Sequence, residues 1–325
     1  ASVQVLADYL PEALNIMADV LRHPKFEPQE IEKERRRTLA MLESDEDTLS
    51  VAGYYLFNEM VYGKHPYHRP PKGYTHTVSA LSRDDILEYY TTYFVPNNTI
   101  LAIVGDVSGT EVFEYVQQYF GEWPSRQLPP YPVCEIPAPE GPVRQSVPRD
   151  KAQTHIYLGH PGIRRMNPDY YAVLTMEHVL GTGPGFTDRI SRKLRDEQGL
   201  AYTVYANITM TAETEPGTFM AYIGTSPEHG TRAIEGVLQE MRELQNTLVP
   251  TQELNVVKEY LTGSYVFSFE TTTQLARYLI EAERFELEQD FLYQYPQKIY
   301  QVTSEDVMRV AQRYLDPDNY YIAII

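Results

Sequence analysis

The sequence of 325 residues contains one cysteine, Cys134, so no disulfide bond can form within the chain. It also contains no apolar run that approaches the roughly 18 residues of a membrane-spanning helix. Basic residues are in deficit, with 28 lysines and arginines against 45 aspartates and glutamates, which gives a net charge of −17. A nucleic-acid groove needs clustered lysine and arginine, so this balance argues against one. A chain without disulfides suits the cytoplasm and the bacterial periplasm alike, and the localisation stays open.

The sequence repeats itself at a distance of about 220 residues, which is the scale of a domain. Residues 82–104 align without a gap with residues 303–325. Both segments open with a Ser/Thr-x-x-Asp capping box, in which the hydroxyl and the carboxylate bond to free amides of the first helical turn. Each predicted helix ends at a Pro-Asn or Pro-Asp turn, and a β-branched strand follows, at 99–104 in the first copy. The repeat therefore predicts two copies of one domain.

A proline-rich segment separates the two copies. Residues 123–149 contain eight prolines, and such a segment continues neither a helix nor a central strand. We therefore expect a first α+β repeat at 1–122, a linker at 123–149 and a second α+β repeat at 150–325.

The opening strand of the second copy, predicted at about 153–158, has no counterpart in the first copy. Moving it back by one repeat length would place it before Ala1. We therefore expect roughly 70 residues of the first copy to be absent from this chain. On that basis residues 1–6 form a strand in the middle of the first domain, and Asp8 caps the helix that follows.

The second copy is predicted to alternate between strands and helices. Asn167-Pro168 is typical of a helix start, and another helix follows the glycine-rich segment 181–185. That segment lacks the spacing and the Lys-Ser/Thr pair of a phosphate-binding loop. A later helix has an apolar stripe with the 3.6-residue helical period. The predictions are helices at 168–180 and 187–198, strands at 201–211 and 218–224, and the stripe Ile234, Val237, Leu238, Met241 and Leu244.

Four phrases occur in order along the chain: HPKFEPQEIEKER, YGKHPYHRP, LSRDDILEYYTTYFVPNNTILAIVGDV and LRDEQGLAYTVYA. Together they resemble the pitrilysin/insulinase family of zinc metallopeptidases, which includes the mitochondrial processing peptidases. The resemblance extends from Ser2 to Ile325. It implies an α+β fold of two duplicated domains, each a mostly antiparallel sheet covered by helices, with the first domain truncated at its N-terminus. It also implies that two such halves, separate or fused, close around a peptide.

In the family, one half binds zinc through an H-x-x-E-H motif and a glutamate that stands seven residues after the glutamate of a Glu-Arg pair. Here that pair is Glu34-Arg35, and Met41 occupies the position of the third ligand. A thioether is a poor zinc ligand beside imidazole and carboxylate, so we interpret Met41 as an apolar packing residue. The H-x-x-E-H motif would lie in the absent segment. We therefore expect no metal ligand in this chain, with zinc in a partner half.

Two histidine-containing segments have the residue types of a metal site. Leu174-Thr-Met-Glu-His178 is the zinc motif with its first histidine replaced by leucine, and we interpret it as a relic of the duplication with a hydrogen-bonded His178. His65, His68 and His76 fall within one short stretch. Three imidazoles could bind a metal, but the prolines around them favour a surface connection.

Arg195 and Tyr202 match an arginine and a tyrosine that the other half of the family contributes to the substrate. The resemblance implies that both are catalytic and substrate-binding residues, because a phenolic O–H or a guanidinium stabilises the oxyanion that forms during peptide hydrolysis. Arg195 could instead be a surface cation at a helix C-terminus. Tyr202 could instead be a core residue, since it shares strand parity with Val204 and Ala206.

We therefore expect a subunit or half of a zinc metalloendopeptidase that does not bind metal, is inactive alone, and contributes Arg195 and Tyr202 to a peptide held with an H-x-x-E-H partner. Two alternatives remain. The chain could belong to a complete zinc protease whose motif lies in the absent residues, or it could be a non-proteolytic scaffold subunit, as some relatives are.

Overall fold

The computed structural model describes residues 1–132, 134–288 and 290–325. By its internal contacts the chain divides into two compact units. Unit 1 consists of Ala1–Leu42, Lys72–Val133 and Val266–Gln289, and unit 2 consists of Glu43–Pro71, Cys134–Tyr265 and Asp290–Ile325.

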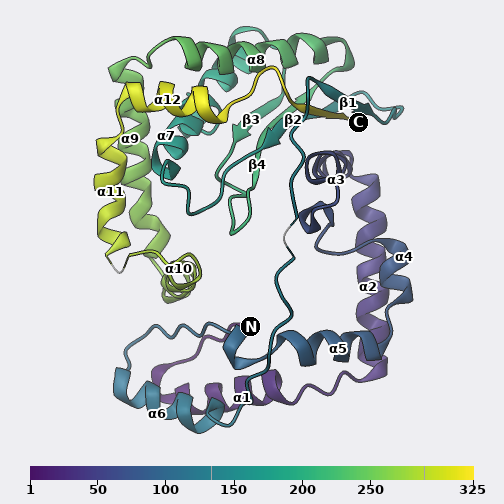
Figure 1. Ribbon diagram of the computed structural model, residues 1–325, viewed down its shortest axis with the longest axis vertical. Coiled ribbons are helices and arrows are strands. Elements are labelled where there is room, and N and C mark those ends of the chain that lie inside the picture. The colour runs from purple at the N-terminus through teal and green to yellow at the C-terminus, as the bar shows by residue number, and fades with distance from the viewer. Residues whose placement is uncertain (133, 289) are drawn as a thin grey trace. The chain divides into compact units, whose positions relative to one another are not determined.

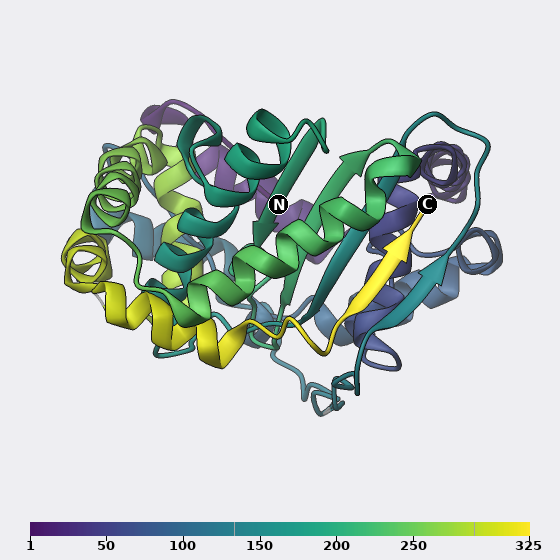
Figure 2. The same cartoon turned by 90° about the horizontal axis from the view of Figure 1, so that it is seen from above.

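Unit 2 contains a five-stranded sheet with the order β1-β5-β2-β4-β3 (Figure 2). The edge strand β1 runs parallel to β5, and the other pairs are antiparallel. All eight residues of β4 are buried. The strands predicted at the start of the second copy and at 218–224 are confirmed, as is the α+β class. The strands are β1 (Val143–Ser146), β2 (Thr154–Pro161), β3 (Thr203–Asn207), β4 (Thr218–Thr225) and β5 (Tyr321–Ile324).

Helices cover one face of this sheet and form the main core with it (Figure 1). The predicted apolar stripe lies on α8, and all five of its residues are buried. Burial of such a stripe is the main stabilisation of a helix packed on a sheet. The helices of unit 2 on or near this face are α7 (Tyr170–Leu180), α8 (Gly230–Asn246), α9 (Thr251–Tyr265), α11 (Phe291–Gln301) and α12 (Ser304–Tyr314).

The opposite face of the sheet is covered by α3 (Leu49–Tyr62), which the sequence places in the first copy. Phe57 and Val61 of this helix are fully buried against Tyr157 and Met220 of the sheet. The hydroxyl of Tyr157 donates to the carbonyl of Ser50 at 2.7 Å. A helix from the segment predicted as the first copy therefore completes the core of unit 2.

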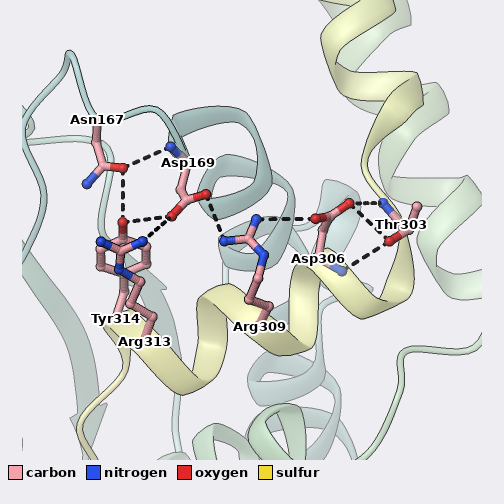
Figure 3. A network of polar contacts seen from close by, with 7 residues as sticks. All are labelled: Asn167, Asp169, Thr303, Asp306, Arg309, Arg313 and Tyr314. Atoms are coloured by element: carbon pink, nitrogen blue, oxygen red, sulfur yellow. Dashed lines mark hydrogen bonds and ion pairs between the residues drawn. The ribbon is translucent and has the colours of Figure 1, made fainter.

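A polar network joins the start of α7 to α12 (Figure 3). Asp169 Oδ1 accepts from Arg309 at 2.8 Å, and Asp169 Oδ2 accepts from Tyr314 at 2.8 Å and from Arg313 at 3.2 Å. The Tyr314 hydroxyl also lies 3.0 Å from Asn167 Oδ1. Burial alone would raise the pKa of Asp169, but the hydrogen bonds from Arg309 and Tyr314 outweigh it, and the pKa falls below its ordinary value.

Unit 1 is helical, and arginine side chains join its elements. Arg35 donates to the carbonyls of Val78 and Leu81, and Arg22 donates to the carbonyl of Tyr119. Its helices are α1 (Leu10–Arg22), most of α2 (Pro28–Asp47), α4 (Thr75–Ala80), α5 (Arg83–Tyr93), α6 (Gly109–Phe120) and α10 (Thr272–Arg284). Among residues 1–132, 134–288 and 290–325, none of the helices has the length and apolarity to cross a membrane.

Two strands predicted for the first copy are not formed. Residues 1–6 and 99–104 have no regular secondary structure, because a strand requires a hydrogen-bonded neighbour and neither segment has one within the described residues. The expectation that Asp8 caps the first long helix is also wrong. The cap position of α1 belongs to Tyr9 and has no side-chain hydrogen bond, and Asp8 lies in a preceding short 3₁₀ helix.

The two capping boxes on which the predicted repeat rests are both present. Ser82 and Asp85 bond reciprocally at the start of α5, and Thr303 and Asp306 do so at the start of α12. The remaining helical segments are one π-helix, η5 (Ser191–Glu197), and 3₁₀ turns at Ala7–Tyr9, Pro66–His68, Pro96–Asn98, Pro184–Phe186, Pro227–His229 and Val266–Phe269.

Candidate functional site

Arg195 lies on the π-helix η5, whose wider turn is uncommon and often occurs at functional sites. The helix is fixed from behind, because Leu194 is fully buried against α8. Gly236 of α8 permits this approach, since a Cβ there would lie 2.2 Å from Leu194 Cδ2. The backbone that presents Arg195 is therefore held closely against the core.

A tight turn brings the backbone of Tyr202 next to that of Arg195. The carbonyl of Leu194 accepts from the backbone N–H of Leu200 at 2.7 Å and from that of Ala201 at 3.3 Å. Gly199 has φ of 62°, which a residue without Cβ adopts at no steric cost. Arg195 comes directly after Leu194 in the sequence, and Tyr202 comes directly after Ala201. The turn thus explains how a spacing of seven residues brings the two backbone segments that carry these side chains close together.

Tyr202 is 71% exposed, so the alternative interpretation of a core tyrosine is wrong. Its backbone N–H donates to the carbonyl of Gly224 at 2.8 Å, which ties it to β4 just before β3 begins. The alternation rule fails at this position because Tyr202 precedes the regular strand, whereas Val204 and Ala206 within β3 are buried. The phenolic group is therefore presented to the surface on a fixed backbone.

The Arg195 side chain contacts a residue that sequence reasoning missed. Its Cζ atom lies 3.9 Å from the centroid of the Phe186 ring, which is within the range of a cation–π contact. Phe186 directly follows the glycine-rich segment 181–185 and is 52% exposed. The signal available in the sequence was an aromatic residue directly after Gly-Pro-Gly, next to the helix that carries Arg195.

The outer edge of β3 is closed by the end of α7. Glu177 Oε2 accepts from the backbone N–H groups of Ile208 and Thr209 at 2.8 and 2.9 Å, and Oε1 contacts the Thr209 hydroxyl at 2.6 Å. The carbonyl of Gly181 accepts from the backbone N–H of Ala206 at 3.1 Å. Burial raises the pKa of Glu177, although these donors act in the opposite direction. The carboxyl group therefore acts as a structural cap for an edge strand.

Two models of known families match this chain. Residues 80–261 match the model described as peptidase M16 inactive domain, and residues 2–65 match insulinase (peptidase family M16). The chain belongs to peptidase family M16. Its fold is that of a crystal structure of an M16 inactive domain from Pseudomonas fluorescens, with a TM-score of 0.86 at 23% identity over 98% of this chain and 76% of that chain.

Two curated relatives in this family have informative names. An uncharacterized zinc protease, YmxG, of Bacillus subtilis is 23% identical over 83% of this chain and 64% of its own length. The mitochondrial-processing peptidase subunit beta of Saccharomyces cerevisiae is also 23% identical, over 83% of this chain and 61% of its own length. The M16 chain described here thus spans less than two thirds of each of these two relatives.

The segment on α7 that we interpreted as a relic of the zinc motif has side chains in structural roles. Glu177 points inward to cap β3, as described above. His178 Nδ1 donates to the carbonyl of Leu174 at 2.9 Å, and burial lowers the pKa of the imidazole. His178 also lines a mostly apolar cavity of about 440 Å³ with Val256 and Val257 of α9. Across the described residues, no cluster of three or more His, Cys, Asp or Glu side chains is arranged to hold a metal ion.

Met41 is 41% exposed on α2, so its interpretation as a packed residue is wrong. The helix turns Leu42 inward instead, and Leu42 is its buried residue. Glu34, at the place of the supporting glutamate in metal-binding M16 halves, is exposed and pairs with Arg37 at 3.5 Å. The thioether therefore stands at the surface where the resemblance places an anionic ligand.

The three clustered histidines have separate environments. His65 is buried and stacks on Tyr62, and its Nδ1 accepts from the backbone N–H of Tyr67 at 3.2 Å. Desolvation lowers the pKa of His65. His68 Nδ1 donates to the carbonyl of His65 at 2.7 Å. His76 stacks on the Tyr74 ring and belongs to unit 1, whereas the other two belong to unit 2. Each of the three rings therefore makes its own local contact.

Proposed function

We propose that this chain is the half of a zinc metalloendopeptidase that does not bind metal, and that it works with a separate or fused partner that carries H-x-x-E-H. Its role is to bind the peptide and to stabilise the oxyanion. The observation that carries this proposal is the position of Arg195 and Tyr202 on either side of one hydrogen-bonded turn, with Tyr202 71% exposed on a backbone tied to the core.

The chemistry of these two side chains fits peptide hydrolysis. A metal in the partner would polarise the carbonyl and activate water. Attack on the carbonyl builds negative charge on its oxygen, and a preorganised phenolic O–H or guanidinium stabilises that charge. Arg195 has five N–H donors in one plane, which suits peptide carbonyls or a carboxylate. Tyr202 has a single O–H donor, which suits one oxygen.

Three further observations support the proposal. The family model that matches the larger part of the chain is described as an inactive domain. Met41 provides a thioether at the position of the third zinc ligand, and Glu177 of the relic motif is committed to capping β3. The yeast relative is named as a subunit, which is compatible with a partner that supplies the metal.

The test is reconstitution with an H-x-x-E-H protein that co-purifies with the tagged chain. Tyr202→Phe and Arg195→Gln should each lower kcat for peptide cleavage, by about 10²-fold if the group acts in the transition state. Tyr293→Phe is the matched control, because Tyr293 is 85% exposed on α11, and it should leave turnover unchanged. Turnover by Tyr202→Phe equal to that of the wild type would overturn the oxyanion role.

A further inference from the structure

The loop between α7 and η5 contains a residue with a strained backbone. Phe186 has φ of 65°, in the left-handed region that bulky side chains rarely adopt. The neighbouring Gly185, with φ of 60°, adopts this region freely because it has no Cβ. Burial does not offset the strain, since Phe186 is 52% exposed. A strained aromatic residue at the surface indicates that the ring has a function at this position.

The ring of Phe186 supports the guanidinium of Arg195, whose Cζ lies 3.9 Å from the ring centroid. This contact uses the flat face of the guanidinium, whereas its N–H donors lie in the plane. Within the described parts of the chain, no carboxylate pairs with Arg195 and no carbonyl accepts from it. The stacking therefore holds the cation and leaves its donors available to a ligand.

The other cations of the same helix are arranged differently. Arg192 lies 3.6 Å from Glu197, and Lys193 pairs with the buried Glu240 of α8. Their charges are matched within the protein. Arg195 is held by an aromatic face alone, which is the arrangement expected for a cation kept for an external acceptor.

We propose that Phe186 is a positioning residue, whose ring fixes the Arg195 guanidinium so that its in-plane N–H groups bind a carbonyl or carboxylate of an extended peptide. This rests on the proposed function, because it names the side chain that holds Arg195 in that site. The strained backbone at Phe186 is retained because a relaxed φ would move the ring away from the guanidinium.

The stacking is measured first by NMR, on the complete chain without a partner. Protons above an aromatic ring are shifted upfield by its ring current, so the δ-methylene signal of Arg195 should be shifted in the wild type and normal in Phe186→Leu. Phe186→Trp should retain the shift, since it preserves an aromatic face. Phe113→Leu is the matched control, because it removes a phenylalanine of α6 that is 64% exposed. Identical Arg195 signals in the wild type and in Phe186→Leu would contradict the proposal.

The consequence for binding is measured with a fluorescently labelled unstructured peptide that has a free carboxylate. Phe186→Leu should weaken binding by about two- to fivefold, which is the range of a surface cation–π contact. Adding it to Arg195→Gln should cause no further loss, because the ring acts only through the guanidinium. Additive losses in the double variant would show that the ring acts independently, and the proposal would then be wrong.

The two tests separate this inference from the proposed function. If the wild-type chain does not bind the peptide, or if Tyr202→Phe cleaves normally in the reconstituted pair, the proposed function fails, and a positioning role toward a peptide fails with it. The ring-current shift would still stand in that case. If the Arg195 δ-methylene signal of the wild type is not shifted but Tyr202→Phe impairs cleavage, only the positioning role of Phe186 is overturned, and the proposed function stands.

Discussion

Glu177 provides the sharpest test of the structural role assigned to the relic motif. The side chain is 4% exposed and contacts three donors, the amides of Ile208 and Thr209 and the Thr209 hydroxyl. Glu177→Ala would leave all three buried groups without their partner. Each buried donor without an acceptor costs about 1–3 kcal/mol, and water that enters the space reduces this cost. The expected loss in the free energy of unfolding is therefore about 3–5 kcal/mol.

Glu177→Gln should behave differently. In the wild type Oε2 accepts from the two amides, and Oε1 accepts from the Thr209 hydroxyl. A glutamine keeps an oxygen facing the two amides, and its NH₂ can donate to the Thr209 hydroxyl, which then acts as the acceptor. The expected change is within about 1 kcal/mol of the wild type. A loss as large as that of Glu177→Ala would refute the reasoning, because it would show that the negative charge is required.

The assay combines denaturant unfolding with amide hydrogen exchange at Ile208 and Thr209, which reports on the cap directly. Exchange at both amides should accelerate in Glu177→Ala and stay protected in Glu177→Gln. The pH dependence follows from linkage. Because the folded-state pKa is raised, the folded state holds a proton that the unfolded state releases, so the stability of the wild type falls as pH rises from the ordinary glutamate range through the raised pKa. Glu177→Gln should lack this decline.

Two more substitutions test other parts of the account. Asp169→Asn should lower the free energy of unfolding by about 1–3 kcal/mol, because Arg309 and Arg313 lose their acceptor charge. The folded-state pKa of Asp169 is depressed, so its stabilisation of the wild type is lost as pH falls from the ordinary aspartate range through the folded pKa. If denaturant titrations gave the same difference in free energy of unfolding between wild type and Asp169→Asn at every pH, this would be contradicted. Phe186→Gly should raise the free energy of unfolding by about 1 kcal/mol, because it relieves the backbone strain, and it should weaken peptide binding. A variant that is both less stable and weaker in peptide binding would argue against strain at this residue.

Local signals in the sequence were sufficient for much of the fold. The capping box at Ser82 and Asp85 is set by residues three positions apart, and it is present as predicted. The stripe on α8 depends only on helical periodicity, and it is buried. Residues 1–6 have the composition of a strand, but a strand needs a neighbour that composition does not reveal.

In the candidate site, features set by neighbouring residues could likewise be predicted, whereas contacts between distant residues could not. The turn at Gly199 made the spacing of Arg195 and Tyr202 informative, because the two residues flank one hydrogen-bonded contact. The contact between Phe186 and Arg195 depends on how the loop folds back on η5, so it could not be read from the sequence alone. The inward direction of Glu177 likewise depends on where β3 ends.

We propose that this chain supplies substrate contacts and leaves the metal to a partner. The most direct measurement is the zinc content of the purified intact polypeptide, by elemental analysis after dialysis against a weak chelator, with peptide cleavage assayed on the same sample. We expect zinc far below one equivalent, because Met41 provides a thioether where the resemblance places an anionic ligand. We also expect no cleavage until the partner is added. One tightly held zinc per chain together with cleavage in the absence of any partner would contradict it.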